Sequence, residues 1–233
     1  MKCARSTAAR GALRVAIALI GSASLSVSAQ TTEVPDASPA ERLLFLQPHL
    51  AGIRPPGTLR YAYVEEGGAG GTLKDAMTID LRADTTGACC DVSGSFLSGP
   101  RALQLPDISQ ARSNPALLYF LEQEVRQLQQ QTRGQSAHFR QRIRLALAHS
   151  ATVSPTTIRW RGSDAAAQRV HIAPYVDDPY RQRFQEASKK EYDFVMSDAV
   201  PGGVYQVLTQ VPGTDRRQTL TLQETSDVRS RAP

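Results

Sequence analysis

The feature that most constrains the fold of this chain is one helical block set between two long series of strand-like segments. Apolar residues recur at every second position before residue 97 and again after residue 157, which is the spacing of half-buried β-strands. Between them, five apolar residues recur at helical spacing: Leu117, Leu118, Leu121, Val125 and Leu128. The strands do not alternate with helices as in βαβ units, so the sequence predicts an α+β fold with an antiparallel sheet.

We expect about eight strands, the first three of which form an antiparallel meander. The segments with strand alternation are 59–63, 77–81, 90–96, 158–160, 170–172, 192–196, 204–211 and 220–222. The sheet is predicted to be curved, like half of a barrel, and to be covered by two or three helices. One apolar face would carry Tyr61, Tyr63, Ile79, Phe96, Trp160, Ile172 and Phe194.

Local signals indicate where the main helix begins and ends. Asn114 is a capping residue, Pro115 suits the first helical turn, and Gly134 is placed to end a helix over 115–131. Glu122 and Glu124 are expected on its outer side. A second helix is predicted near 139–147, in preference to a strand, and a short charged helix over 181–190.

A shorter helix is predicted at the start of the folded part. Ser38 can cap this helix, Pro39 suits its first position, and Glu41 completes a capping box. Pro48 would limit the helix to about two turns.

The first 29 residues have the features of an export signal. A basic stretch without acidic residues precedes a short apolar run at 15–20, and small residues end at Ala29. We therefore expect cleavage after Ala29 and a periplasmic location. The predicted organisation is a signal peptide over 1–29, a flexible leader over 30–37, a single α+β domain over 38–225 and a disordered tail over 226–233.

Removal of the signal leaves the mature chain with almost no net charge. Four of the 27 basic residues lie in 1–29, which leaves 23 basic against 22 acidic residues in the mature chain. This near balance argues against a nucleic-acid partner. The mature chain also has no apolar run of the roughly 20 residues that a membrane-spanning helix needs.

Two adjacent cysteines remain after processing, Cys89 and Cys90. Successive side chains of a strand point to opposite faces, which favours two separate thiols over a bond between neighbours. A vicinal disulfide, an intermolecular disulfide and a soft-metal site remain alternatives.

The sequence lacks the common catalytic and cofactor motifs, so we predict no catalytic residue, no metal site and no cofactor. There is no Gly-x-Ser-x-Gly, no His-Glu-x-x-His and no dinucleotide-binding glycine pattern. A hydrolase that uses His138 or His171 with Asp177 or Asp178 is the least favoured functional hypothesis.

Several segments resemble those of uncharacterised secreted proteobacterial proteins: 120–122, 139–144, 173–179 and 192–205. At the level of architecture, an exported chain with a curved antiparallel sheet around helices resembles the periplasmic carriers of the Lol lipoprotein pathway. This resemblance covers most of the mature chain in element order, without a diagnostic motif. It implies an incomplete barrel that holds acyl chains, as in the soluble carrier rather than in its lipid-anchored receptor.

The leading hypothesis is a non-catalytic periplasmic protein that binds a lipid, a lipoprotein or another apolar or amphipathic ligand on the concave face. Apolar burial at about 25 cal/mol per Å² would drive binding. The predicted wall residues are Tyr61, Tyr63, Trp160, Phe194 and Tyr205. In one alternative the helix fills this face and leaves no cavity. In another, the protein is an envelope assembly factor that contacts protein partners through loops 173–179 and 201–203.

Overall fold

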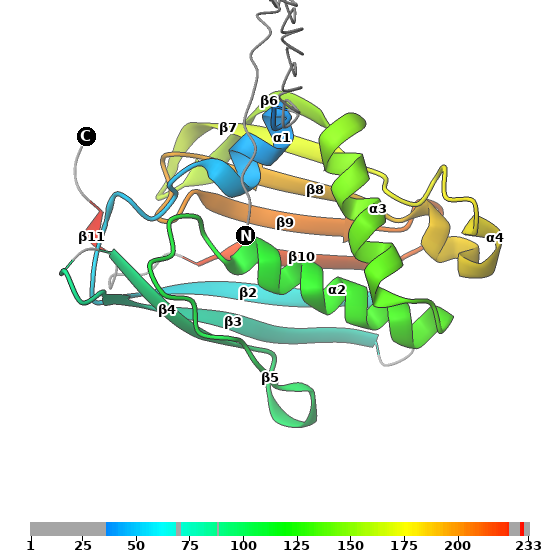
Figure 1. Cartoon of the computed structure of the whole chain (residues 1–233), viewed down its shortest axis with the longest axis horizontal. Coiled ribbons are helices and arrows are strands. Elements are labelled where there is room, and N and C mark those ends of the chain that lie inside the picture. The colour runs from blue at the N-terminus through cyan, green and yellow to red at the C-terminus, as the bar shows by residue number, and fades with distance from the viewer. Residues whose placement is uncertain (1–35, 69–70, 88, 224–228, 231–233) are drawn as a thin grey trace, which may run out of the picture. The chain divides into compact units, whose positions relative to one another are not determined.

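A nine-stranded antiparallel sheet forms the framework of the protein (Figure 1). The computed structural model describes residues 36–68, 71–87, 89–223 and 229–230, so the predicted signal and most of the leader lie outside the described residues. The strand order is β5-β4-β3-β2-β10-β9-β8-β7-β6. The strands are β2 (Gly57–Gly68), β3 (Gly71–Ala83), β4 (Cys89–Phe96), β5 (Leu103–Gln104), β6 (Thr152–Trp160), β7 (Ser163–Ile172), β8 (Glu191–Met196), β9 (Val204–Gln210) and β10 (Arg217–Leu222).

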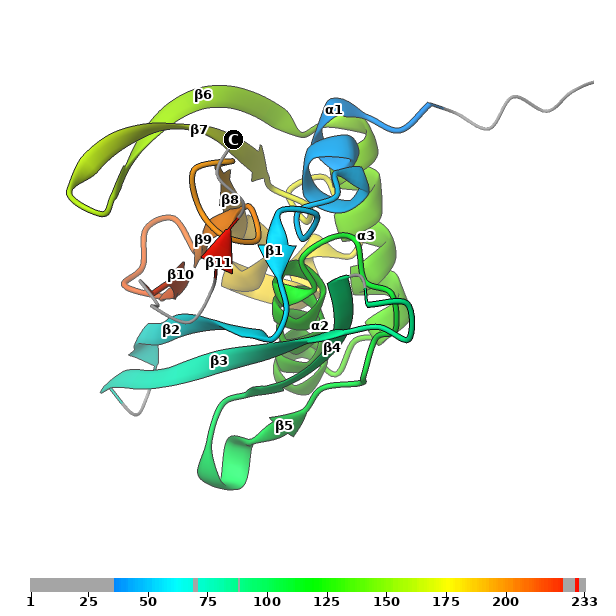
Figure 2. The same cartoon turned by 90° about the vertical axis from the view of Figure 1, so that its left-hand side faces the viewer.

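Two antiparallel meanders meet in the middle of this sheet. The first runs from β2 to β5 and the second from β6 to β10, and β10 joins them by pairing with β2 in the register Leu220↔Tyr63. The sheet does not close into a barrel, because β5 and β6 lie at opposite edges. In Figure 2 it curves around helix α2 (Ala116–Thr132). The predicted α+β class and antiparallel sheet are confirmed.

A separate two-stranded sheet pairs β1 (Ile53–Arg54) with β11 (Arg229–Ser230) in the register Ile53↔Ser230. Two residues of the predicted tail therefore form regular backbone pairing. The other tail residues, together with 224 and 225, lie outside the described part.

Helices α2 and α3 (Ser136–His149) follow β5 in the chain and lie over one face of the sheet (Figure 1). Helix α2 ends differently from the prediction, because Arg133 takes the left-handed conformation with φ of 54°. Gly134 has another function: a Cβ atom there would lie 2.7 Å from the ring of Phe139. The glycine is needed for this close packing and not for a left-handed cap.

The remaining helices are short. Helix α1 (Pro39–Glu41) has the predicted capping box, in which Ser38 N–H donates to Glu41 Oε2 at 2.8 Å and Glu41 N–H to Ser38 Oγ at 3.1 Å. A π-helical turn η1 (Arg42–Leu46) continues it, and a 3-10 turn η2 (Gly99–Arg101) precedes β5. The predicted charged helix is α4 (Arg181–Phe184) followed by η3 (Gln185–Lys189).

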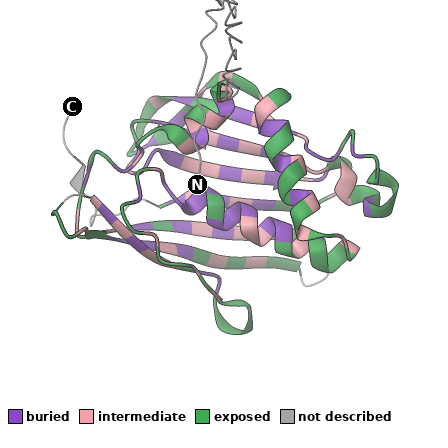
Figure 3. Ribbon diagram, viewed as in Figure 1, coloured by how far each residue is buried: buried purple, intermediate pink, exposed green. Residues whose placement is uncertain are grey.

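The core lies between α2, α3 and the covered face of the sheet (Figure 3). The alternating buried residues of β2, β3, β8 and β10 point to this face, and those of α2 meet them. Large aromatic residues dominate it: Tyr61, Tyr63, Tyr175, Tyr192, Phe96, Phe120, Phe139 and Phe194 are fully buried.

Buried Asn114 fastens the beginning of α2. Its Nδ2 group donates to Tyr61 Oη and to the carbonyl of Gly202, both at 2.8 Å, and its Oδ1 accepts from Ala116 N–H at 3.0 Å. The predicted capping function is therefore present. The side chain also joins α2 to strand β2 and to the loop between β8 and β9.

Trp160 does not share the covered face of the sheet with Phe194. The register pairs Val153 with Val170 and Val170 with Phe194, which places these three on one face. Trp160 is seven positions from Val153, so its side chain points to the opposite face. In β7 the buried side chains switch from one face of the strand to the other between Ala167 and Val170. At this point the β6–β7 hairpin extends past the end of β8, which pairs with β7 from Gln168 onward. The prediction of one shared face is therefore wrong for Trp160.

The sulfur atoms of Cys89 and Cys90 lie in contact, as in the vicinal disulfide that was one of the alternatives, and not apart as predicted. The register between β3 and β4 shifts at Arg82 and Ala83, where Cys89 pairs with Ala83. Because this strand end is irregular, the alternation of a regular strand does not apply to it.

Candidate ligand-binding site

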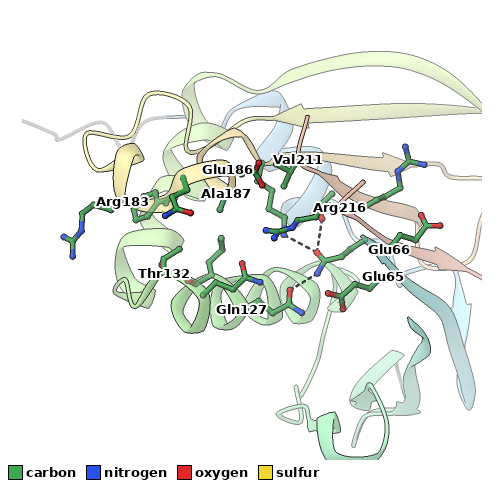
Figure 4. Close-up of a pocket in the computed structure, with 17 residues that line it drawn as sticks. Glu65, Glu66, Gln127, Thr132, Arg183, Glu186, Ala187, Val211 and Arg216 are labelled. Carbon is green, nitrogen blue, oxygen red and sulfur yellow. Dashed lines mark hydrogen bonds between the residues drawn. The ribbon is translucent and has the colours of Figure 1, made fainter. Parts of the chain in front are cut away.

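A pocket of about 600 Å³ lies where the C-terminal half of α2 faces the ends of β9 and β10 and the α4–η3 segment (Figure 4). This volume is within the range of roughly 300–1,000 Å³ that is usual for small-molecule sites. Gln127 and Thr132 line it from α2, Ala187 from η3, and Val211 and Gln218 from the β9–β10 hairpin. Helix, sheet and connecting segment thus all contribute to it.

A network of amide and hydroxyl groups crosses the pocket from the sheet to α2. Gln218 Nε2 donates to Gln127 Oε1 at 2.7 Å, and Gln218 Oε1 accepts from Thr209 Oγ1 at 2.9 Å and from Lys190 Nζ at 3.2 Å (Figure 4). Thr209 and Gln218 are buried residues of the covered face. These bonds connect α2 to β9, β10 and the start of β8.

Lys190 also forms an ion pair with Glu124 of α2. The exposed fractions of the two side chains are only 11% and 2%, and the ammonium group lies 5.8 Å from the ring centroid of Tyr192. Removal of two charges from water costs several kcal/mol per ion, so a buried pair adds little net stability.

Two buried tyrosine hydroxyls, those of Tyr175 and Tyr192, lie near this ion pair and interact with each other, but neither makes a hydrogen bond of normal geometry. Glu124 Oε2 contacts the lysine but likewise makes no hydrogen bond of normal geometry. Burial raises the pKa of both tyrosines, and the negative charge of Glu124 raises the pKa further. Both hydroxyls therefore stay protonated and can donate hydrogen bonds.

Glu124 is not on the outer side of α2, so that prediction is wrong. Glu124 lies three positions after Leu121 and four before Leu128, within the buried stripe of the helix. The signal was present, since an acidic residue at these spacings interrupts the apolar stripe. Glu122, two positions away, does face outward and binds Arg140 at 2.7 Å.

The rim of the pocket carries exposed charges of both signs. Arg183, Arg216 and Arg217 line it together with Glu66 and Glu186. In the described ranges, none of the three arginine side chains lies within 4.0 Å of a carboxylate. These guanidinium groups are therefore available to a charged ligand.

Three of the predicted wall residues lie beneath α2. Tyr61 is bonded to Asn114, Tyr63 meets Phe96 edge-on at 5.2 Å between ring centroids, and Phe194 stacks on Tyr192 at 6.4 Å. Their side chains are fully buried, so helix and core residues fill this part of the concave face.

The other two predicted wall residues form a separate aromatic pair. Trp160 at the end of β6 and Tyr205 at the start of β9 meet edge-on at 6.3 Å. The structure therefore does not bring them together with Tyr61, Tyr63 and Phe194.

The two histidines considered for catalysis each contact a different aspartate. His138 Nε2 is 2.7 Å from Asp178 Oδ2, and Arg142 Nε is 3.3 Å from the same oxygen. His171 instead pairs with Asp193 at 3.1 Å. Asp178 also accepts from the backbone of Tyr180 at 2.7 Å, so its contacts hold loop 173–180 against α3.

The loops predicted to contact partners are packed against the core. Tyr175 and Asp178 in the first loop are buried, and Gly202 and Gly203 in the second pack against Asn114 and His49. Among the described residues, no three His, Cys, Asp or Glu side chains are grouped as a metal site requires, and no helix is long and apolar enough to cross a membrane.

Comparison with known proteins gives distant similarities only. No family model and no curated protein sequence matches the chain. Among solved structures, the lipoprotein LppX of Mycobacterium tuberculosis aligns with a TM-score of 0.32 and 9% identity, over 75% of this chain and 87% of that one. A putative outer membrane lipoprotein-sorting protein domain from Vibrio parahaemolyticus aligns with a TM-score of 0.27 and 11% identity, over 82% and 93%. Similarity at these TM-scores supports no argument about fold or ligand.

Proposed function

We propose that this chain is an exported binding protein for an amphipathic, lipid-like ligand. The polar end of the ligand would lie in the pocket at the end of α2. Its apolar part would enter between α2 and the sheet, against Tyr63 and Phe194. The observation that carries this proposal is a pocket of about 600 Å³ that adjoins the aromatic covered face.

The contacts of α2 support this direction of entry. Toward its C-terminal half, α2 meets the sheet through the Glu124–Lys190 pair and the Gln127–Gln218 bond. A polar group of a ligand can form the hydrogen bonds and ion pair that these side chains now make with each other. A purely apolar interface has no such bonds for a ligand to take over. Enclosure of the apolar part would contribute about 25 cal/mol per Å² of buried surface.

The test fills the pocket with a bulky side chain. Residues 30–233 and the Ala187→Trp variant would be incubated with 1-monopalmitoylglycerol, and binding measured by native mass spectrometry and isothermal titration calorimetry. Ala187 lines the pocket, so the tryptophan should abolish binding. The control is Ala199→Trp, because Ala199 is exposed in the β8–β9 loop at the other end of β8. Binding that survives Ala187→Trp unchanged would reject this site.

An accessory function through protein contacts is the second candidate, favoured by an apolar groove on the outer side of the helices. This groove of about 360 Å³ lies between α2 and α3 and includes Leu118, which is 52% exposed. Exposed apolar surface of this kind is typical of contact sites. A Leu118→Ser variant that remains folded but no longer crosslinks to envelope proteins would support this candidate.

A further inference from the structure

A single carboxylate of α2 lies among donor groups that all belong to the rest of the fold. Lys190 immediately precedes β8, Tyr192 belongs to β8, and Tyr175 lies in the loop after β7. Only Glu124 comes from the helix. The sheet and its connecting loop therefore present an ammonium group and two phenol hydroxyls on one side, and α2 supplies the anion on the other.

Glu124 does not give all three donors a hydrogen bond of normal geometry. Lys190 forms the ion pair, whereas the two completely buried tyrosine hydroxyls make no hydrogen bond of normal geometry, although they interact with each other and that of Tyr192 interacts with Glu124. An unsatisfied buried hydroxyl costs about 1–3 kcal/mol, so folded proteins rarely leave two of them together. An anionic group in a slightly different position could accept from all three donors.

Of these three donors, Lys190 reaches the pocket. Lys190 lines it, and Gln218, which accepts from Lys190, lies in its wall. A ligand in the pocket therefore needs only to displace the side chain of Glu124 to reach the ammonium group. The neighbouring Gln127–Gln218 bond would break in the same movement.

We propose that Glu124 occupies an anion site belonging to the ligand, and that the ligand is an apolar chain ending in a carboxylate. This rests on the proposed function and specifies its ligand class. In the free protein, Glu124 neutralises Lys190 and holds α2 over the sheet. In the complex, the ligand carboxylate takes the position of Glu124, and the hydroxyls of Tyr175 and Tyr192 donate to it.

The test compares palmitate with the uncharged 1-monopalmitoylglycerol, which has the same acyl chain, by calorimetry below their micelle concentrations. Glu124→Gln removes the competing charge and should bind palmitate about tenfold more tightly, with little change for the glyceride. Lys190→Met should weaken the binding of palmitate at least tenfold and change the affinity for the glyceride by no more than about twofold. Matched controls are Glu122→Gln on the outer side of α2 and Lys189→Met on the exposed side of η3.

Because Lys190→Met leaves a buried carboxylate alone, the double variant Glu124→Gln/Lys190→Met is measured beside it. It retains no buried charge at this place, and it should bind acid and glyceride equally. Equal effects of Lys190→Met on both ligands, or an unchanged palmitate affinity in Glu124→Gln, would overturn the anion site. If the glyceride binds without any preference for palmitate, only this inference fails; if neither compound binds, the proposed function fails as well.

Discussion

The buried ion pair between Lys190 and Glu124 makes a quantitative prediction about stability. We consider Lys190→Met, which keeps most of the volume and apolar stem of lysine but removes its charge. Glu124 is 2% exposed and has no other cation within 4.0 Å in the described residues. Its carboxylate would therefore remain in the core without a counter-charge.

The expected cost is large because the remaining charge is isolated from water. Removal of one partner from a buried pair typically costs 3–5 kcal/mol. Lys190 also donates to Gln218 Oε1, but that oxygen keeps its bond from Thr209, so this loss adds little. We therefore expect Lys190→Met to lower the free energy of unfolding by about 3–5 kcal/mol.

The assay is equilibrium urea unfolding of residues 30–233, followed by circular dichroism and by fluorescence. The double variant Glu124→Leu/Lys190→Met replaces both charges by apolar groups and should lie within about 1–2 kcal/mol of the natural protein. The matched control is the Arg140–Glu122 pair, which joins α3 to the outer side of α2, with exposed fractions of 48% and 37%. Because water screens it, Arg140→Met should cost less than about 1 kcal/mol.

Two results would refute this reasoning. A Lys190→Met cost no larger than that of Arg140→Met would mean that the carboxylate is solvated in the native protein. A double variant as unstable as the single one would mean that packing, and not charge, is lost.

Three further predictions concern other parts of the chain. Asn114→Ala leaves the hydroxyl of Tyr61 and a carbonyl unpaired in the core and should cost about 2–4 kcal/mol in urea unfolding, against about 1 kcal/mol for Tyr61→Phe. Burial lowers the pKa of His49 below its usual 6.5, so the unfolded chain binds the proton more readily. Stability should therefore be full above pH 6.5 and fall as the pH decreases below it, less steeply in His49→Gln. Intact-mass analysis of the exported protein should give residues 30–233, and a mass that includes residues before Gln30 would contradict cleavage after Ala29.

The fold class could be predicted because local signals and periodicity agree over long segments. Ser38 with Glu41, and Asn114 with Pro115, indicate helix starts through backbone groups only a few residues away. Strand alternation is equally local, and it located the strands on both sides of α2.

The error over Trp160 concerns contacts between segments that are distant in the chain. Alternation shows that Ile158 and Trp160 share a face, but it does not show which face meets the core, because that depends on where β7 leaves β8. The position of Glu124 could have been found from its spacing. Its partner Lys190 could not, because 66 residues separate them and nothing local to either residue indicates the pair.

The two ends of α2 are held by different kinds of contact, which predicts where the helix opens. Its first half is fastened by Asn114 and by fully buried Leu117 and Phe120. Its last turn beyond Leu128 is exposed or half-buried and borders the pocket. Fewer buried contacts mean a smaller free energy of local opening, so backbone amides of 129–132 should exchange with deuterium faster than those of 120–125. If ligand enters here, palmitate should slow exchange in 124–132 and leave 117–121 unchanged; slowing only at the Asn114 end would place entry on the opposite side.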